Sequence, residues 1–313
     1  MARGKCGLRN RSKTKAVETT EVGFHQSKVN CKRSRTFLIS YEDKEQMKEA
    51  IDRFLAELEA RVFVEIHCVN LESCFESRVE SLVGEALREN GMFYVTNHGF
   101  PCDVLEDLRR LVAVLFSLPL EEKRKCCNAP GVKRMKYTDT PDGETLEVSC
   151  GSAALQRMDW RTEPALLTKV MAEYLSKHQG LCHKLFQTIR RSMNPSGFRS
   201  NGSCFEPYMQ LTIRSYHPAP DSIWPTTLDS RTHSSYLTMT FLDPSGGLQI
   251  FTQDRWSNVK PCPGAILITG GDQLQALTEG DYKSCLHRVV AGKSARRTFI
   301  DVSFIVTTEL ESE

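Results

Sequence analysis

Two histidines and three arginines in the last third of the chain have side chains that could hold a metal ion or an anion. His233 and His287 can each offer a nitrogen lone pair to a metal as neutral imidazoles. Arginine cannot, because its guanidinium group stays protonated at any relevant pH. Arg214, Arg231 and Arg297 could instead form a cationic pocket that binds a carboxylate through paired N–H groups. These residue types point to a site for a metal, a small acid, or both.

A series of short motifs around these residues has an order and spacing typical of one known family. The motifs are, in chain order, Gly247-Leu248-Gln249-Ile250, Trp256, Pro261-Cys262-Pro263-Gly264-Ala265, Gly271-Asp272-Gln273-Leu274-Gln275 and Tyr282-Lys283-Ser284-Cys285-Leu286-His287-Arg288-Val289-Val290. They resemble the Fe(II)- and 2-oxoglutarate-dependent dioxygenases of the isopenicillin N synthase-like type. Asn97-His98-Gly99 and Met158-Asp159-Trp160-Arg161 resemble the N-terminal region of the same family. The resemblance extends over about residues 62–305.

The resemblance sets a register for the expected metal ligands. Members of the family carry His-x-Asp on one strand and a second histidine much later, and these three side chains bind iron on one face. In the family a Leu-Thr pair follows this motif, and it aligns with Leu237-Thr238 here without a gap. This alignment places Arg231 at the position of the family's first histidine and His233 at the position of its aspartate. A two-residue slip would instead make His233 the first ligand and leave Ser235 in the aspartate's place. His287 corresponds to the second histidine, and Arg231 stands at a lost ligand position in the ungapped register.

The motifs expected to hold 2-oxoglutarate are also altered. In the family, Arg-x-Ser on a late strand holds the distal carboxylate of this co-substrate, with help from Asn-x-Tyr on an earlier strand. Here the two motifs read Arg297-Thr298-Phe299 and Arg214-Ser215-Tyr216. The resemblance therefore implies that Arg297 and Tyr216 bind 2-oxoglutarate, with Arg214 beside them. It implies iron held weakly by His233 and His287, and no catalytic residue separate from the metal site.

The hydrophobic pattern divides the chain into a helix-rich and a strand-rich part. Apolar residues at helical spacing predict helices over 44–60, 76–89, 104–116 and 164–193. Gly91 suits the left-handed residue that follows a helix end. From Tyr208 onward, short strands with turns about every ten residues predict a sandwich or jelly roll. The predicted strands of this region are 209–216, 236–242, 248–252, 265–269, 287–291 and 298–306, and two earlier strands are predicted over 62–66 and 92–95.

Together with the resemblance, this pattern predicts a mostly β core with flanking helices. The expected fold is a double-stranded β-helix (jelly roll, cupin-like) with a helical N-terminal region. The predicted divisions are a basic tail over residues 1–36, a helix-rich N-terminal region over 37–200, a jelly-roll oxygenase domain over 201–308, and a tail over 309–313.

Composition and charge indicate the compartment and exclude some partners. The chain lacks an apolar run of the ~20 residues that a membrane helix needs, and lacks a secretory signal pattern. Its twelve cysteines include no C-x-x-C pair, which is typical of reduced thiols and favours a cytoplasmic protein. Residues 1–35 hold ten Lys/Arg against two Glu, so this segment could direct the chain to the nucleus or an organelle. Nucleic-acid binding is disfavoured, because interleaved aromatic residues and a recognition motif are lacking.

Two functional hypotheses follow. The first is a 2-oxoglutarate-dependent dioxygenase that hydroxylates or desaturates a small organic metabolite. The second is a family member that has lost catalysis and binds a small anionic ligand or a protein partner, with Arg231, Arg214 and Arg297 as a cationic pocket without metal. The replacement of His-x-Asp by Arg231-Thr232-His233 makes iron affinity the property that separates them.

Overall fold

The computed structural model describes residues 44–48, 50, 51, 54, 62–72, 76–127, 135–150, 165–193, 207–219 and 230–306. Contacts divide the chain into two units, Met1–Gln46 and Met47–Glu313, and the elements below belong to the second. The predicted tails over 1–36 and 309–313 lie outside the described residues, as does the motif Met158–Arg161. The predicted helix over 44–60 is described only in part.

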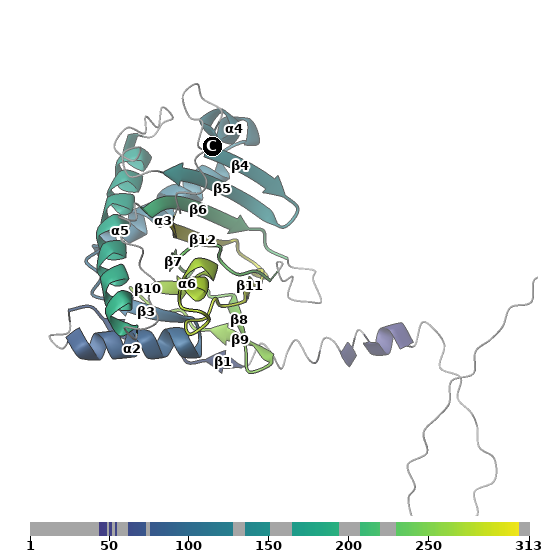
Figure 1. Ribbon diagram of the computed structural model, residues 1–313. Coiled ribbons are helices and arrows are strands. Elements are labelled where there is room, and N and C mark those ends of the chain that lie inside the picture. The colour runs from purple at the N-terminus through teal and green to yellow at the C-terminus, as the bar shows by residue number, and fades with distance from the viewer. Residues whose placement is uncertain are drawn as a thin grey trace, which may run out of the picture. The chain divides into compact units, whose positions relative to one another are not determined.

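Two β-sheets form the centre of the second unit (Figure 1). The larger sheet has eight strands in the order β2-β3-β10-β7-β12-β6-β5-β4, and the smaller has four in the order β1-β9-β8-β11. The strand bounds are β1 Phe63–Val64, β2 Cys68–Asn70, β3 Met92–Thr96, β4 Met135–Thr140, β5 Gly143–Cys150, β6 Pro207–Tyr216, β7 Leu237–Phe241, β8 Leu248–Thr252, β9 Arg255–Val259, β10 Ile266–Gly270, β11 His287–Val289 and β12 Arg297–Val306. The pairing is mostly antiparallel, as expected for a jelly roll.

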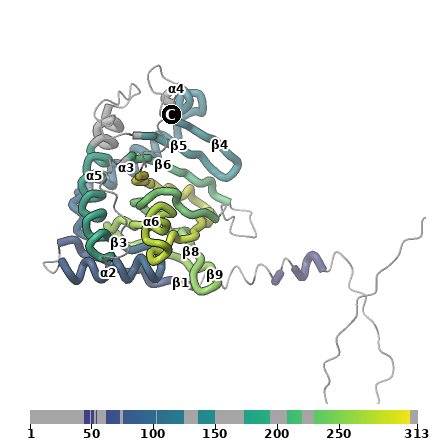
Figure 2. Tube along the Cα trace, in the orientation of Figure 1, coloured from purple at the N-terminus to yellow at the C-terminus, as the bar shows by residue number. Residues whose placement is uncertain are grey.

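Helices cover the face of the larger sheet that points away from the smaller one (Figures 1 and 2). Three long helices, α2 (Glu76–Glu89), α3 (Cys102–Ser117) and α5 (Ala165–Ser192), pack against one another and against this sheet. Two shorter helices are α4 (Leu120–Cys127) and α6 (Asp272–Leu277). No described helix combines the length and apolar character required to span a membrane.

Successive side chains of the large sheet point to opposite faces and therefore contribute to two hydrophobic cores. One core joins the sheet to the helices and includes Ile268, Leu237 and Val302. The other lies between the two sheets and includes Leu267 and Phe299. Because β7 and β10 are central strands covered on both faces, all five residues of each are buried. The space between the sheets is therefore apolar except where functional side chains enter it.

A β-hairpin in the region predicted to be helix-rich extends the larger sheet. Its strands β4 and β5 are joined by the turn at Pro141-Asp142, and β5 pairs with β6 along its whole length. The pattern of apolar residues did not predict this hairpin, and it did not predict β2, β9, α4 or α6. The hairpin is polar on its exposed positions, so its strand character depends on pairing with β6, which is distant in the sequence.

Gly91 has the left-handed backbone that the sequence predicts, with a φ of 68°. A Cβ atom at this position would lie 2.6 Å from the carbonyl oxygen of Lys283. We expect Gly91→Ala to lower the free energy of unfolding by at least ~2 kcal/mol, from backbone strain and this contact together. The control is Gly180→Ala in the exposed middle of α5, where nothing lies within 4 Å of the new Cβ. It should stabilise the protein by up to ~1 kcal/mol, and urea denaturation of both variants distinguishes the two effects.

Candidate active site

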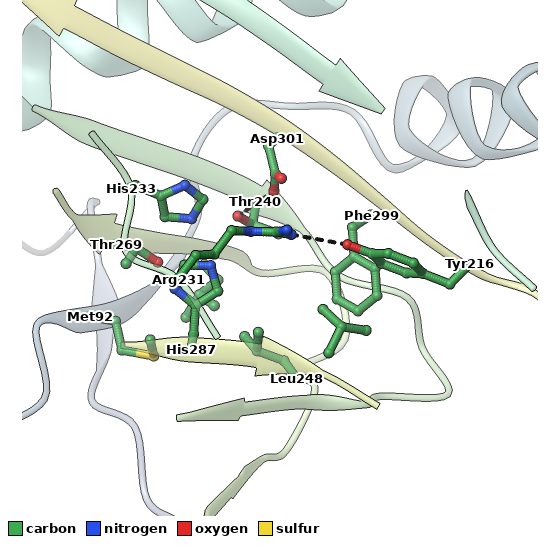
Figure 3. A pocket seen from close by; sticks show the side chains of 12 residues that line it. Met92, Tyr216, Arg231, His233, Thr240, Leu248, Thr269, His287, Phe299 and Asp301 are labelled. Atoms are coloured by element: carbon green, nitrogen blue, oxygen red, sulfur yellow. Dashed lines mark hydrogen bonds between the residues drawn. The ribbon is translucent and has the colours of Figure 1, made fainter. Parts of the chain in front are cut away.

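A pocket of about 360 Å³ lies between the two sheets and contains most of the residues predicted to do chemistry (Figure 3). Four of them line it, namely Arg231, His233, His287 and Tyr216. The other lining residues are polar on one side and apolar on the other: Thr240, Thr269, Asp301, Met92, Leu248, Leu267, Val289 and Phe299. The pocket thus places titratable groups beside a small apolar surface, as in many sites for small organic molecules.

Backbone contacts fix the segment that carries Arg231 and His233. Arg231 forms a two-way backbone bridge with His287, with N···O distances of 2.9 and 3.0 Å. The amide of Asp272, at the start of α6, donates to the carbonyl of His233 over 2.7 Å. Gly271 is required at this point, because a Cβ there would lie 2.0 Å from the carbonyl oxygen of Ser235. The motif around Gly271-Asp272 therefore positions Arg231 and His233 in the pocket.

The Arg231 guanidinium group lies across the pocket. Its Nη2 atom donates a hydrogen bond to the Tyr216 hydroxyl oxygen over 3.0 Å (Figure 3). Its Nε atom is buried and has no hydrogen-bond partner. No carboxylate of the described residues forms a salt bridge with Arg231. The Arg231 guanidinium group is therefore held in the pocket with at least one N–H donor, on Nε, unpaired.

The two histidines of the pocket are neutral and stacked. Burial, with a smaller effect of neighbouring His287, lowers the pKa of His233 to about 3. Burial also lowers the pKa of His287, which is 5% exposed. The Nδ1 atom of His287 donates to the carbonyl of Cys285 over 3.0 Å, which leaves Nε2 with its lone pair. The two rings stack with centroids 4.5 Å apart and planes inclined by 27°.

Asp301, a lining residue of the pocket, forms an ion pair with Arg214 behind it. Nη1 of Arg214 lies 2.5 Å from Oδ2 of Asp301, and the Thr240 hydroxyl donates to Oδ1 over 2.8 Å. Asp301, 6% exposed, was not among the residues predicted for the site. It lies four residues after Arg297, on the same face of β12, so strand alternation was the signal that could have identified it. The charge of Asp301 is balanced by Arg214.

Arg297 and Arg214, both predicted to bind 2-oxoglutarate, do not line the pocket. Nη1 of Arg297 donates to the carbonyl of Val290, and its Nε lies 3.4 Å from the Ser245 hydroxyl. The guanidinium group packs on Gly247, which has no Cβ to block it. Arg297 pairs with Tyr216 in the β12–β6 register. It lies on the same face of β12 as the lining residues Phe299 and Asp301, at the end of the strand. Of the predicted co-substrate residues, Tyr216 alone is a lining residue.

The placement of these side chains agrees with the ungapped register. Arg231 and His233 face His287 in the pocket. Ser235, the alternative residue for the aspartate position, does not line the pocket and is hydrogen-bonded to the Thr238 hydroxyl over 2.9 Å. The roles of these residues stay predictions.

Comparison with known sequences identifies the family. Residues 207–304 match the 2OG-Fe(II) oxygenase superfamily, and residues 66–169 match the family described as non-haem dioxygenase in morphine synthesis N-terminal. The 2-oxoglutarate-dependent dioxygenase 19 of Oryza sativa subsp. japonica is 30% identical over 235 residues, which cover 72% of this chain and 70% of the relative. Flavanone 3-dioxygenase 2 of the same organism is 28% identical over 242 residues, covering 74% and 71%.

Solved structures share the fold. The Arabidopsis thaliana dioxygenase for auxin oxidation 1, in complex with 2-oxoglutarate, has a TM-score of 0.67 and 22% identity, and covers 80% of this chain and 96% of that one. The chain belongs to the 2OG-Fe(II) oxygenase superfamily. The predicted jelly roll is confirmed, and so is the predicted reaction class, the Fe(II)/2-oxoglutarate-dependent oxidation of a small organic molecule. Fe(II) and 2-oxoglutarate are the cofactor and co-substrate of this class.

The residues of this pocket do not form the three-ligand iron centre of such enzymes. No group of three His, Cys, Asp or Glu side chains among the described residues is arranged to hold a metal. His233 and His287 are the two lining residues that can offer a nitrogen lone pair to a metal, and their rings stack on each other. The carboxylate of Asp301 is engaged by Arg214 and Thr240. A unit charge such as Arg231 at ~4 Å also opposes a divalent ion by about 8 kcal/mol at an effective dielectric constant of ~20.

The buried histidines make a pH dependence of stability predictable. Burial lowers the pKa of His178 to about 3, as it does for His233. Between pH 6.5 and 3 the unfolded chain binds protons that the folded chain does not, so stability is complete above pH 6.5 and falls with acidification. The expected slope is up to ~1.4 kcal/mol per pH unit for each such histidine.

Urea denaturation between pH 7.5 and 4.5 measures this slope. His178→Leu, which lies outside the pocket, should flatten the slope because one of the buried groups no longer titrates. Equal slopes for this variant and the unmodified chain would contradict the assignment of neutral, buried histidines.

Proposed function

We propose that this chain uses its pocket to bind 2-oxoglutarate or a similar small dicarboxylate, and that weak iron binding limits its turnover as a dioxygenase. The observation that carries the proposal is the position of Arg231, between His233 and Tyr216, with a buried and unpaired Nε atom. An arginine at this position removes a metal ligand and adds an anion-binding group in the same place.

The charge balance of the pocket supports an acidic ligand. Arg231 and Asp301 are the lining residues that carry charge at neutral pH, since both histidines are neutral. Arg214 compensates Asp301. One positive charge is left in a partly desolvated site, and an anion is its natural complement.

The apolar side of the pocket supports a substrate with a carbon skeleton. Met92, Leu248 and Val289 contribute aliphatic surface to the lining of the pocket. Two relatives are named flavanone 3-dioxygenase 2 and gibberellin 20 oxidase 1-B, after organic compounds. We infer a small organic metabolite as substrate, in the cytoplasm, without a membrane or nucleic acid as partner; a protein partner is the expectation if catalysis is lost.

Production of succinate from 2-oxoglutarate tests the proposal. The assay contains Fe(II), ascorbate and oxygen, and compares the unmodified chain with the double variant Arg231→His, His233→Asp, which restores the family's ligand set. We expect the unmodified chain to be slower by at least ~100-fold. A binding free energy for Fe(II) that is weaker by ~2.7 kcal/mol already lowers the iron affinity by that factor. Equal rates, with both proteins folded, would overturn the proposal.

A further inference from the structure

We propose that Arg231 takes the electrostatic place of the metal, so that a carboxylate binds directly to its guanidinium group in the metal-free pocket and competes with a metal ion for that space. The inference rests on the proposed function, because it specifies how the same pocket holds its acid. It concerns the residue at the lost ligand position, and it predicts the opposite metal dependence from a site in which the acid chelates iron.

The position of Arg231 is fixed by its backbone. The two-way bridge to His287 joins it to β11, while the carbonyl of His233 is held by the amide of Asp272. The backbone bridge fixes where the side chain starts, and the hydrogen bond from Nη2 to the Tyr216 hydroxyl holds the guanidinium group in the pocket. A cation held in this way is pre-organised for a ligand, since little conformational freedom is lost on binding.

Its donors are only partly used. A guanidinium group has five N–H bonds, and the Tyr216 hydroxyl accepts one of them over 3.0 Å. The buried Nε–H has no partner, which is unfavourable until an acceptor is present. A carboxylate can accept two parallel N–H bonds from guanidinium, and this geometry would satisfy the unpaired donor.

Tyr216 adds a further donor at the same point. Because its oxygen accepts from Arg231, its own O–H remains available to donate to a carboxylate oxygen. The ring is held by an edge-on contact with Phe299, at a centroid distance of 5.7 Å. Arg231 and Tyr216 thus form a fixed pair of donors directed into the pocket.

Neighbouring groups do not compete for the anion. Arg214 is engaged by Asp301 over 2.5 Å, and the Arg297 guanidinium donates to Val290 outside the lining of the pocket. The Nε2 atom of His287 carries a lone pair and can accept a hydrogen bond from a hydroxyl group or from water.

Calorimetry on the full chain in a chelating buffer tests the proposal, with 2-oxoglutarate and succinate as probes. Both should bind without metal, and adding Mn(II) should leave the affinity unchanged or weaken it. Arg231→Met should weaken binding by at least ~30-fold, the effect of removing one partner from a desolvated charge pair. Arg255→Met, an equal loss of charge at an exposed residue of β9, is the matched control and should change the affinity by less than about 3-fold.

Two results would overturn the inference. One is binding that appears only when Mn(II) is present, which would assign the acid to the metal. The other is loss of binding in Arg297→Met together with full binding in Arg231→Met, which would assign the carboxylate to the outer end of β12. In the double variant Arg231→His, His233→Asp, Mn(II) should instead tighten binding of 2-oxoglutarate. These outcomes are independent of the succinate assay, so failure of the inference and failure of the proposed turnover limit are distinguishable.

Discussion

Replacing Arg231 by His and His233 by Asp together should tighten Fe(II) binding by at least ~100-fold, since the change removes a repulsive charge and adds a carboxylate. The backbone of both positions is already fixed by the bridge to His287 and by Asp272, so the new side chains enter a formed site. Anaerobic titration with Fe(II), followed by calorimetry, gives the two affinities.

The single variants are the controls for this result. Arg231→His alone leaves three imidazoles without a carboxylate, and His233→Asp alone places a carboxylate beside the Arg231 guanidinium, where the two would pair. Each single change should therefore recover only a small part of the gain. An affinity of the double variant equal to that of the unmodified chain would show that Arg231 does not limit metal binding.

Glu144→Ala should lower the free energy of unfolding by about 3–5 kcal/mol, because it leaves the buried Lys123 without its counter-charge. Glu144 on β5 is 4% exposed and accepts hydrogen bonds from Lys123, Tyr137 and Arg296. Burial alone would raise the pKa of this carboxyl, but the three donors hold it below its usual value. Lys123, on α4, is itself 7% exposed.

The control is Arg296→Ala, which removes a different partner of the same carboxylate. The Arg296 side chain is 43% exposed, so water can replace it and the expected loss is at most ~1 kcal/mol. Urea denaturation at neutral pH measures both variants. Equal losses would contradict the expectation that the buried Lys123–Glu144 pair contributes more than the exposed Arg296 contact.

The parts of the fold that follow from local pattern were predictable from the sequence. The helix Glu76–Glu89 has its apolar residues at helical spacing, and Gly91 ends it with the expected positive φ. The sequence also predicted β6, β7, β8, β10, β11 and β12, because each is a short apolar run between turns. The β4–β5 hairpin was missed because its stability comes from pairing with β6, about 65 residues later in the chain, and pairing of that kind leaves no local signal.

The candidate site was predictable in the identity of its residues but not in their directions. Arg231, His233, His287 and Tyr216 were identified and line one pocket. The direction of Arg297 depends on the absence of a side chain at Gly247, and the neutralisation of Arg214 depends on Asp301, 87 residues later. Both are contacts between distant strands, and they become evident only when the β6–β12 register is known.

Anaerobic Fe(II) titration of the unmodified chain is the most direct test of the central claim, that Arg231 has converted the metal position into an anion site. The account predicts weak, substoichiometric iron, because two stacked imidazoles beside a fixed guanidinium group cannot hold the ion tightly. It also predicts that 2-oxoglutarate lowers the iron affinity further. Tight binding of one Fe(II) per chain, strengthened by 2-oxoglutarate, would contradict the account.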